Sequence, residues 1–465
     1  MERKNVWNSY SKKRLEKVNV FAKGYMEFLD HGKTERECTD TIVNTIEKEG
    51  YKELQSFIKE GKKVKTGDKV YAVCMNKSVI MFHIGEDGME TGMNILGAHL
   101  DSPRLDVKQN PMYEDGGIAY LDTHYYGGVK KYQWVTIPLA IHGVVVKKDG
   151  TIVEINIGER EDDPVFFISD LLIHLSAEQL EKKAAKVIEG EALDIIIGNI
   201  PLVGEDGKEE KEAVKKGMLK ILKETYDIEE EDFESAELEV VPAGKAREAG
   251  FDRSIILGYG HDDRVCAYSS LMAMLEVKNI KRTSCCILVD KEEIGSVGAT
   301  GMQSRFFENM VAEVINLMGS YSDLAVKRCL ANSAMLSSDV SAAYDPSFAS
   351  CFDKKNVAFM GQGMVFNKYT GARGKSGSND ANPEYIAHIR NILEEADVIH
   401  QTAELGKVDL GGGGTIAYIL ANYGMNVIDC GVAVMSMHAP WEAISKADLY
   451  ETKRGYKAFL EKVTI

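Results

Sequence analysis

Five short clusters of His, Asp and Glu residues could carry metal-assisted chemistry. They lie in the segments GAHLDSPR (97–104), GYGHDDR (258–264), DKEEIGS (290–296), SSDVS (337–341) and MSMHAPWE (435–442). Each cluster lies at the end of an apolar run or in an adjoining loop, and ligands collect at the ends of strands in open α/β sheets. This shared location is the main indication of a functional site.

The first cluster places His99 and Asp101 two positions apart. On an extended strand both side chains point to the same face. A neutral imidazole is a good ligand for Zn²⁺, and a nearby carboxylate can fix its orientation. An ordinary polar turn contains the same residue types, so this spacing alone leaves both interpretations open.

Two acidic pairs follow apolar runs. Asp262 and Asp263 stand between an apolar run and a helical pattern. A carboxylate there could bridge two cations about 3.5 to 4 Å apart, although an Asp at this position also commonly caps a helix. The adjacent side chains of Glu292 and Glu293 diverge, so one could bind a metal while the other accepts a proton from water. A solvated surface pair is the alternative for the two glutamates.

The last two clusters each contain one residue suited to metal binding. Asp339 lies among small, uncharged residues, where a buried carboxylate needs a counter-charge such as a metal. His438 follows the mostly apolar run IDCGVAVMSM and precedes Pro440 and Trp441. A turn Asp and a core or capping His are the alternatives.

A glycine run also opens a helical pattern. Backbone N–H groups of Gly411 to Gly414, which precede Thr415, could hold a carboxylate or carbonyl oxygen. A simple tight turn is the alternative. The chain lacks both the GK[ST] ending of a phosphate loop and a GxGxxG fingerprint, which argues against a nucleotide site.

The elements that must position these clusters alternate between strand and helix. From Arg253 onward the apolar runs SIILGYG, SCCILVD, VAFMG and NVIDCGVAV alternate with helical patterns, and 69–100 contains three further strand-like runs. Such alternation predicts an α/β layer with a mostly parallel sheet. Helical spacing predicts two helices within 8–60.

Residues 108–244 have a different pattern. β-Branched and aromatic runs such as YLDTHYYGGV and TIVEINIG are separated by turn signals. The sequence therefore predicts a discontinuous α/β catalytic domain, 1–107 and 245–465, interrupted by a β-rich domain at 108–244. The acidic segment 229–237 indicates a solvated helix face or loop.

Composition excludes several classes of protein. The formal charge of −16 argues against nucleic acid or an anionic membrane surface as the partner. No stretch of about 18 apolar residues occurs, and the first 17 residues lack the apolar region of a signal peptide. The eight cysteines are scattered without a CxxC spacing, which is typical of reduced thiols. We expect a cytoplasmic protein.

Taken together and in order, GAHLDSPRLDVK, HDDR, DKEEIGS, SSDVSAAYDP and SMHAPWE closely resemble the aspartyl aminopeptidase family of dinuclear zinc metallo-aminopeptidases, in its bacterial type. The resemblance spans nearly the whole chain and includes HYYGGVKKYQW and LLIHL in the predicted insert. It implies a hydrolase that removes the N-terminal residue from peptides with a free N-terminus.

The resemblance also implies two divalent metal ions in each subunit, with zinc as the default and Co²⁺ or Mn²⁺ as alternatives. It assigns one metal to His99, Asp262 and Asp339. It assigns the second to Asp262, Glu293 and His438, so that Asp262 bridges the two ions.

Three further roles follow from the resemblance alone. Glu292 is the expected general base, which takes a proton from the metal-activated water, and Asp101 supports the histidine ligand. His174 matches a histidine that reaches the active site of a neighbouring subunit. The resemblance therefore implies a homo-oligomer, a tetrahedral dodecamer in this family, with the insert serving oligomerisation and substrate gating.

One departure concerns specificity. Aspartyl-specific eukaryotic members carry a histidine three residues after the Asp339-type ligand, where this chain has Ala342. Lys368, Arg373 and Lys375 are basic candidates for reading an acidic side chain, although basic residues in a Gly-rich loop are commonly solvated. An aminopeptidase is therefore expected more firmly than an acidic preference.

Two competing functions use the same residues differently. A carboxypeptidase or deacylase would keep the metal ligands and change the pocket that reads the substrate terminus. A non-enzymatic scaffold would have lost ligands or the base, yet all of the expected residue types are present.

Overall fold

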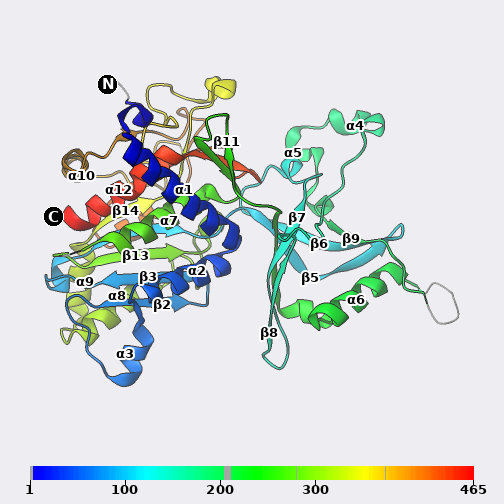
Figure 1. The fold of residues 1–465 in the computed structure, drawn as a ribbon, viewed down its shortest axis with the longest axis horizontal. Helices are drawn as coiled ribbons and strands as arrows, with labels where there is room; N and C mark the ends of the chain where they lie inside the picture. The colour runs from blue at the N-terminus through cyan, green and yellow to red at the C-terminus, as the bar shows by residue number, and fades with distance from the viewer. Residues whose placement is uncertain (1–3, 204–210, 279, 372, 465) are drawn as a thin grey trace. The chain divides into compact units, whose positions relative to one another are not determined.

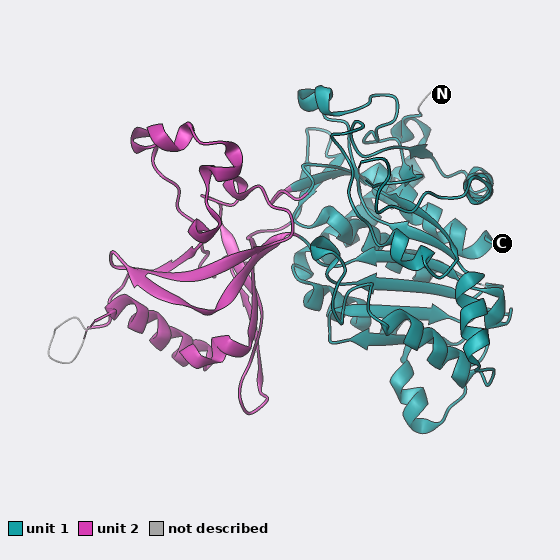
Figure 2. Cartoon of the chain, turned by 180° about the vertical axis from the view of Figure 1, so that it is seen from behind, with its two compact units in different colours: residues 1–102, 246–437, 442–465 teal, residues 103–245, 438–441 magenta. Residues whose placement is uncertain are grey.

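The computed structural model describes residues 4–203, 211–278, 280–371 and 373–464. The chain forms two compact units (Figure 2). Unit 1 comprises 1–102, 246–437 and 442–465, and unit 2 comprises 103–245 and 438–441. Unit 2 begins before residue 108 because Arg104 already starts the long strand β5 of its sheet.

A nine-stranded sheet forms the centre of unit 1, in the order β1-β2-β3-β13-β4-β14-β18-β16-β17 (Figure 1). Strands β13, β4, β14 and β18 run parallel, and antiparallel pairs occur towards both edges. The mostly parallel α/β layer that the sequence predicted is therefore confirmed. The strands are β1 (Lys52–Glu53), β2 (Lys69–Cys74), β3 (Ser78–His83), β4 (Asn94–His99), β13 (Ser284–Val289), β14 (Ala334–Ser338), β16 (Met364–Asn367), β17 (His400–Thr402) and β18 (Asn426–Gly431).

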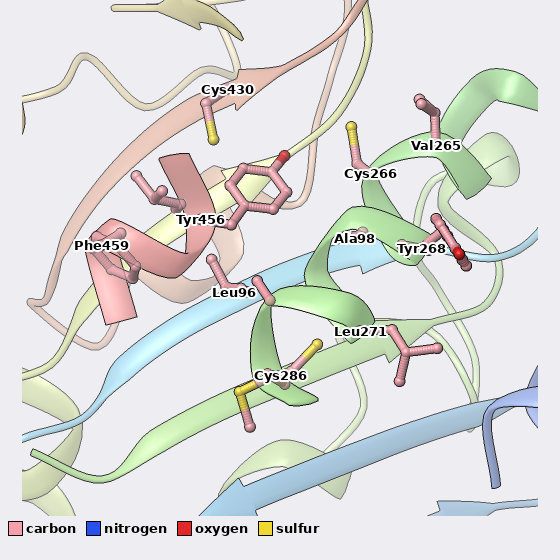
Figure 3. Packing of buried hydrophobic residues seen from close by; sticks show 14 of the residues in the cluster. Leu96, Ala98, Val265, Cys266, Tyr268, Leu271, Cys286, Cys430, Tyr456 and Phe459 are labelled. Carbon is pink, nitrogen blue, oxygen red and sulfur yellow. The ribbon is translucent and has the colours of Figure 1, made fainter. Parts of the chain in front are cut away.

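Two apolar clusters sandwich this sheet. Successive strand residues point to opposite faces, so Cys286 packs in one cluster and its neighbour Cys285 in the other. Figure 3 shows the first cluster, where Leu96 and Leu271 lie with Cys286. Helices α1 (Lys12–His31), α2 (Glu35–Lys48), α7 (His261–Glu276), α10 (Pro383–Glu395) and α12 (Lys446–Lys462) contribute to it, and α3 (Leu54–Glu60), α8 (Phe306–Leu317), α9 (Asp323–Ala331) and α11 (Ala417–Ala421) contribute to the other. Within the described ranges, no helix combines the length and the apolar character needed to cross a membrane.

Unit 1 contains a second, five-stranded sheet that the sequence did not predict as a separate layer. Its order is β11 (Arg247–Ala249), β12 (Ile255–Gly258), β20 (Glu442–Ser445), β19 (Ala433–Met435) and β15 (Ser341–Ala342). The strand expected at VAFMG (357–361) is wrong, because only Ala358 makes a bridge there. Gly361 and Gly363 both have positive φ, so the chain turns before β16 begins.

Unit 2 is an antiparallel six-stranded sheet with a helix packed against it. The strand order is β8-β7-β10-β5-β6-β9, and α6 (Ala213–Tyr226) packs on β5, β6 and β9. The acidic segment forms a 3-10 helix over Glu230–Ser235 that buries Phe233. The strands are β5 (Arg104–Asp115), β6 (Ile118–Tyr126), β7 (Leu139–Val146), β8 (Ile152–Ile157), β9 (Ile195–Gly198) and β10 (Ala236–Pro242), and two short helices are α4 (Ala177–Leu180) and α5 (Ala184–Val187).

A buried histidine lies at the start of α7. His261 is fully buried, with Nδ1 2.7 Å from the Tyr25 hydroxyl and Nε2 3.1 Å from the carbonyl oxygen of Ile256. Burial disfavours the charged ring and lowers the pKa of His261 to about 3. The ring is therefore neutral in the folded protein over most of the pH range.

This lowered pKa predicts a pH-dependent stability. Between pH 3 and about 6.5 the unfolded chain binds a proton at His261 that the folded chain does not, so the contribution of His261 to the free energy of unfolding rises with pH. The contribution is up to about 1.4 kcal/mol per pH unit, and it is constant above the unfolded-state pKa. We expect the difference in unfolding free energy between wild type and His261→Gln to grow through this window in denaturant titrations. A difference that stays constant with pH would contradict the assignment, and His31→Gln at an exposed site is the control.

Candidate metal centre

The carboxyl ends of three neighbouring parallel strands bring most of the expected ligands to one edge of the large sheet. β4 lies between β13 and β14 and runs parallel to both. His99 is the last residue of β4, Asp339 directly follows β14, and Glu292 and Glu293 follow β13 in a 3-10 turn, Glu292–Ile294. Asp262 lies at the start of α7, immediately after β12 and a short turn. These residues are therefore positioned by strand ends, where α/β sheets bind ligands.

The imidazole of His99 faces three carboxylates. Its Nε2 lies 3.2 Å from Asp262 Oδ1, 3.9 Å from Asp339 Oδ1 and 4.0 Å from Glu292 Oε2. Its Nδ1 lies 3.0 Å from the main-chain carbonyl oxygen of Asp101. An N–H on Nδ1 can donate to that carbonyl, which leaves the Nε2 lone pair directed at the carboxylates.

These separations fit a divalent cation. Two ligand atoms of a tetrahedral zinc site, each about 2.0 to 2.2 Å from the metal, lie roughly 3.3 Å apart. Ligand atoms of His99, Asp262 and Asp339 all lie within 4.8 Å of one another, as do those of His99, Glu292 and Glu293. Asp262 and Glu293 also approach each other within that distance. One imidazole nitrogen with several carboxylate oxygens is a donor set suited to Zn²⁺.

Electrostatics favours a cation at this place. Burial lowers the pKa of His99, but the carboxylates of Asp101 and Asp262 more than reverse this and hold the pKa well above its usual value. Burial and the negative charges of Asp262 and Glu292 raise the pKa of Asp339 well above its usual value. Both shifts have the same cause, because clustered carboxylates favour bound positive charge, either as protons or as a metal ion.

Asp101 fixes the two glutamates as well as the histidine. Its side chain is fully buried, and its carboxylate oxygens accept the backbone N–H groups of Glu292 and Glu293, each at 3.1 Å. Oδ1 also lies 3.4 Å from Nδ1 of His99. One carboxylate thus joins the end of β4 to the turn after β13.

Of the other residues that the sequence singled out, two histidines belong to unit 2 and one carboxylate is the chain neighbour of Asp262. His438 belongs to unit 2, in the connection between β19 and β20, and its Nδ1 lies 3.1 Å from the carbonyl oxygen of Gly128. His174 lies in an exposed turn of unit 2, Ile173–Leu175. Asp263, the second member of its acidic pair, is fully buried and its pKa is raised by burial. Of this pair, Asp262 is the one that faces His99.

The basic specificity candidates already have acidic partners. Lys368 pairs with Asp380, and Lys375 pairs with the same carboxylate at 3.0 Å. Lys375 Nζ also lies 3.8 Å from the centre of the Tyr369 ring. Arg373 is exposed.

The residue that follows the glycine run, Thr415, is held by the side chain of Asp429, which the sequence did not indicate. Thr415 donates to buried Asp429 at 2.6 Å, and the N–H of Gly413 donates to the carbonyl of Thr370 at 3.0 Å. The N–H of Gly413 is therefore already paired within the protein.

Two residues that contact Asp262 were missed at the level of sequence. Ser102 and Glu442 each hydrogen-bond its backbone. Both stand inside segments singled out for their histidines, GAHLDSPR and MSMHAPWE. These two segments therefore indicated that Ser102 and Glu442 could lie near the centre. The spacing of residues within the segments did not indicate that either side chain would bind the backbone of Asp262.

Known proteins match this chain over nearly its whole length. Residues 28–460 match the M18 family, described as aminopeptidase I zinc metalloprotease. A protein of Clostridium acetobutylicum named probable M18 family aminopeptidase 1 is 62% identical over 459 residues, which cover 99% of this chain and 98% of that protein. The crystal structure of an M18 aminopeptidase from Thermotoga maritima matches with a TM-score of 0.95 and 46% identity, and covers 100% of both chains.

A more distant structure shares the fold alone. The mApe1 dodecamer of S. cerevisiae is 19% identical, with a TM-score of 0.76, and the match covers 96% of this chain and 97% of that chain.

The position of Asp101 predicts a selective effect on metal binding. In Asp101→Asn the amide NH₂ group would face one of the two backbone N–H groups, so the Glu292–Glu293 turn loses an acceptor. Changing a group that orients metal ligands costs about 10- to 100-fold in metal affinity. We expect a loss of this size, measured by zinc competition with a chromophoric chelator.

Asp448 provides the matched control for this substitution. It is fully buried in unit 1 and accepts two backbone N–H groups, from Gly361 and Gly363, at 2.7 Å each. Asp448→Asn should lower thermal stability while zinc affinity stays at the wild-type value. Equal zinc affinities for Asp101→Asn and wild type would refute the role given to Asp101.

Proposed function

The chain belongs to the M18 family of aminopeptidase I zinc metalloproteases and is thus an exopeptidase of the hydrolase class, and we propose that Glu292 is the general base with which it removes the N-terminal residue of peptides. The observation that carries this proposal is the convergence of His99, Asp262, Glu292, Glu293 and Asp339 at one sheet edge.

We propose that two divalent ions bind here, with zinc as the default. His99, Asp262 and Asp339 would hold one, and Asp262, Glu293 and His438 the other. The first set is supported by its mutual distances. The role of His438 as a ligand is supported by the family resemblance. It is also supported by its place in the chain, since His438 directly follows Met437, where a segment of unit 1 ends. Bound ions of this kind supply Lewis acidity, which lowers the pKa of water and polarises a carbonyl oxygen.

Glu292 carries out the proton transfers of the proposed reaction, and Asp101 supports it. The Glu292 side chain is 15% exposed, so it can meet both substrate and water from the solvent side. Its carboxylate accepts a proton from the water that attacks the first peptide carbonyl, and returns it to the leaving amine. Asp101 holds the Glu292 backbone and so fixes the starting point of that side chain. The surrounding carboxylates favour a protonated α-amino group, which restricts the reaction to the N-terminal residue.

We propose that an acidic first residue is not required. Lys368 and Lys375 share the carboxylate of Asp380, which reduces the positive charge that either could offer to a substrate. Ala342 in β15 offers no hydrogen-bonding or charged group. A preference for neutral side chains is therefore the expected outcome of a substrate panel.

We further propose a homo-oligomer formed through unit 2, in the cytoplasm. The segment that contains His174 exposes Leu172, Ile173 and Leu175 by 54%, 68% and 67%. Contiguous exposed apolar side chains of this kind mark protein interfaces. A dodecamer is the expected assembly by analogy with the fold relative mApe1. All eight cysteines are free, which suits a reducing compartment.

Peptidase assays test the central proposal. We expect dipeptides and p-nitroanilides with a free amino group to be cleaved, and their N-blocked forms to resist. Chelation should abolish cleavage and Zn²⁺, Co²⁺ or Mn²⁺ should restore it. Glu292→Gln should lower kcat by about 10²- to 10⁴-fold, the usual contribution of a general base, while zinc stays bound.

A carboxypeptidase or deacylase, the alternative function, would give a different result in the same assay. Cleavage of N-blocked peptides from the carboxyl end, or of N-acyl groups, would favour the carboxypeptidase or deacylase reading. An unchanged kcat in Glu292→Gln would remove this residue from the mechanism even if the protein is an aminopeptidase.

The oligomer proposal predicts a change in molar mass. Replacing Leu172 and Leu175 together by Ser removes apolar area that would be buried between copies, so the assembly should dissociate at lower concentration. Light scattering after size exclusion measures this. Replacing exposed Val20 of α1 by Ser is the control for loss of surface apolarity in unit 1. A wild-type protein that is monomeric at all concentrations contradicts the proposal.

A further inference from the structure

The backbone of Asp262 is held on both sides by side chains from elsewhere in unit 1. Its N–H donates to Glu442 Oε2 at 3.0 Å, and its carbonyl oxygen accepts from Ser102 Oγ at 2.6 Å. Asp262, Glu442 and Ser102 are all buried. A carboxylate acceptor makes a stronger hydrogen bond than a neutral one, and low dielectric strengthens it further.

Asp262 needs this support because regular secondary structure does not provide it. Its φ and ψ are −81° and 105°, and those of Asp263 are −118° and 26°, so neither residue is helical although both lie within α7. The N–H groups at a helix start have no partner within the helix. A buried N–H without an acceptor is unfavourable because it has lost its hydrogen bond to water, and Glu442 supplies the acceptor.

Sheet pairing sets the position of Glu442. It is the first residue of β20 and lies opposite Gly258, the last residue of β12. The chain then passes through Gly260, whose φ is 75°. A Cβ at Gly260 would lie 2.1 Å from the Arg264 guanidinium and 2.9 Å from Ser102 Oγ, so only glycine fits. The route from β12 to Asp262 is thus short and tightly packed.

We propose that Glu442 is a positioning residue that keeps the Asp262 carboxylate directed at the metal centre. This role rests on the function proposed above, in which Asp262 would bridge the two ions. Asp262 Oδ1 lies 3.2 Å from His99 Nε2, a separation that suits two ligands of one ion. Rotation of the Asp262 backbone would change this separation, and the hydrogen bond to Glu442 opposes that rotation.

Three variants of the full-length protein separate positioning from simple stability. Glu442→Ala removes the acceptor, and Glu442→Gln keeps a neutral one. Glu451→Ala is the matched control, because Glu451 is also fully buried in unit 1 and accepts a backbone N–H, that of Ile399, at 3.0 Å. Zinc affinity by chelator competition, thermal unfolding without metal, and kcat with KM are measured for each.

We expect Glu442→Ala to bind zinc about 10- to 100-fold more weakly than wild type, and Glu442→Gln to recover most of the loss. At saturating zinc the change should appear in kcat more than in KM, because a displaced bridging ligand acts on the reaction centre. Glu451→Ala should unfold at a lower temperature, as Glu442→Ala does, and keep wild-type zinc affinity.

The outcomes distinguish failure of the positioning role of Glu442 from failure of the aminopeptidase function. Wild-type zinc affinity in Glu442→Ala, or equal losses in Glu442→Ala and Glu451→Ala, overturns the positioning role while leaving the aminopeptidase proposal intact. A wild-type protein that binds no zinc and cleaves no free-amino peptide overturns the function itself. The two failures therefore cannot be confused.

Discussion

The candidate centre of unit 1 depends on one constraint, which is that several carboxylates with little exposure to solvent surround a single buried imidazole. Like charges at such distances repel strongly, and burial makes each charge costlier. The pKa values of His99, which lies beside carboxylates, and of Asp339, which is buried among them, are both raised, and this is the direction that such a cost imposes. A divalent cation relieves it more completely. The cluster is therefore unfavourable as structure and becomes favourable through metal binding, which is a reason to interpret it as a functional centre.

Holding such a cluster requires rigid supports, and the fold provides them through strand ends and side-chain acceptors. Parallel pairing of β4 with β13 and β14 sets where three connecting segments begin. Hydrogen bonds then fix each segment. The carboxylate of Asp101 accepts the Glu292 N–H, the main-chain carbonyl oxygen of Cys430 accepts the Asp339 N–H, and the carboxylate of Glu442 accepts the Asp262 N–H. Each support is buried, so water competes little with these bonds. The ligands are thus positioned through their backbones as much as through their side chains.

Most of the candidate ligands could be picked out from the sequence because their residue types cluster at strand ends in short segments. Strand patterns at 69–100 and 284–290 placed His99 and Glu292 at or just after strand ends, where the structure also has them, since fully buried strands are recognisable as apolar runs. The sequence did not predict the second sheet of unit 1, whose strands β11, β15 and β19 are too short for a clear periodicity. It also could not assign a partner to Glu442, because that contact joins residues 180 positions apart in the chain. Nor could it distinguish the wrong strand at 357–361 from a true one, because the glycines that turn the chain lie after the apolar residues.

Three of the four connections between the two units adjoin, in the sequence, segments that carry candidate residues of the centre. Unit 1 ends at Ser102, resumes at residue 246, ends again at Met437 and resumes at Glu442. The first crossing follows Asp101, and the last two flank the His438 segment. Ser102 and Glu442, the unit 1 residues at two of these crossings, are the ones that hold the Asp262 backbone. An inserted domain can therefore share a chain with the metal centre while the geometry of Asp262 is set within unit 1.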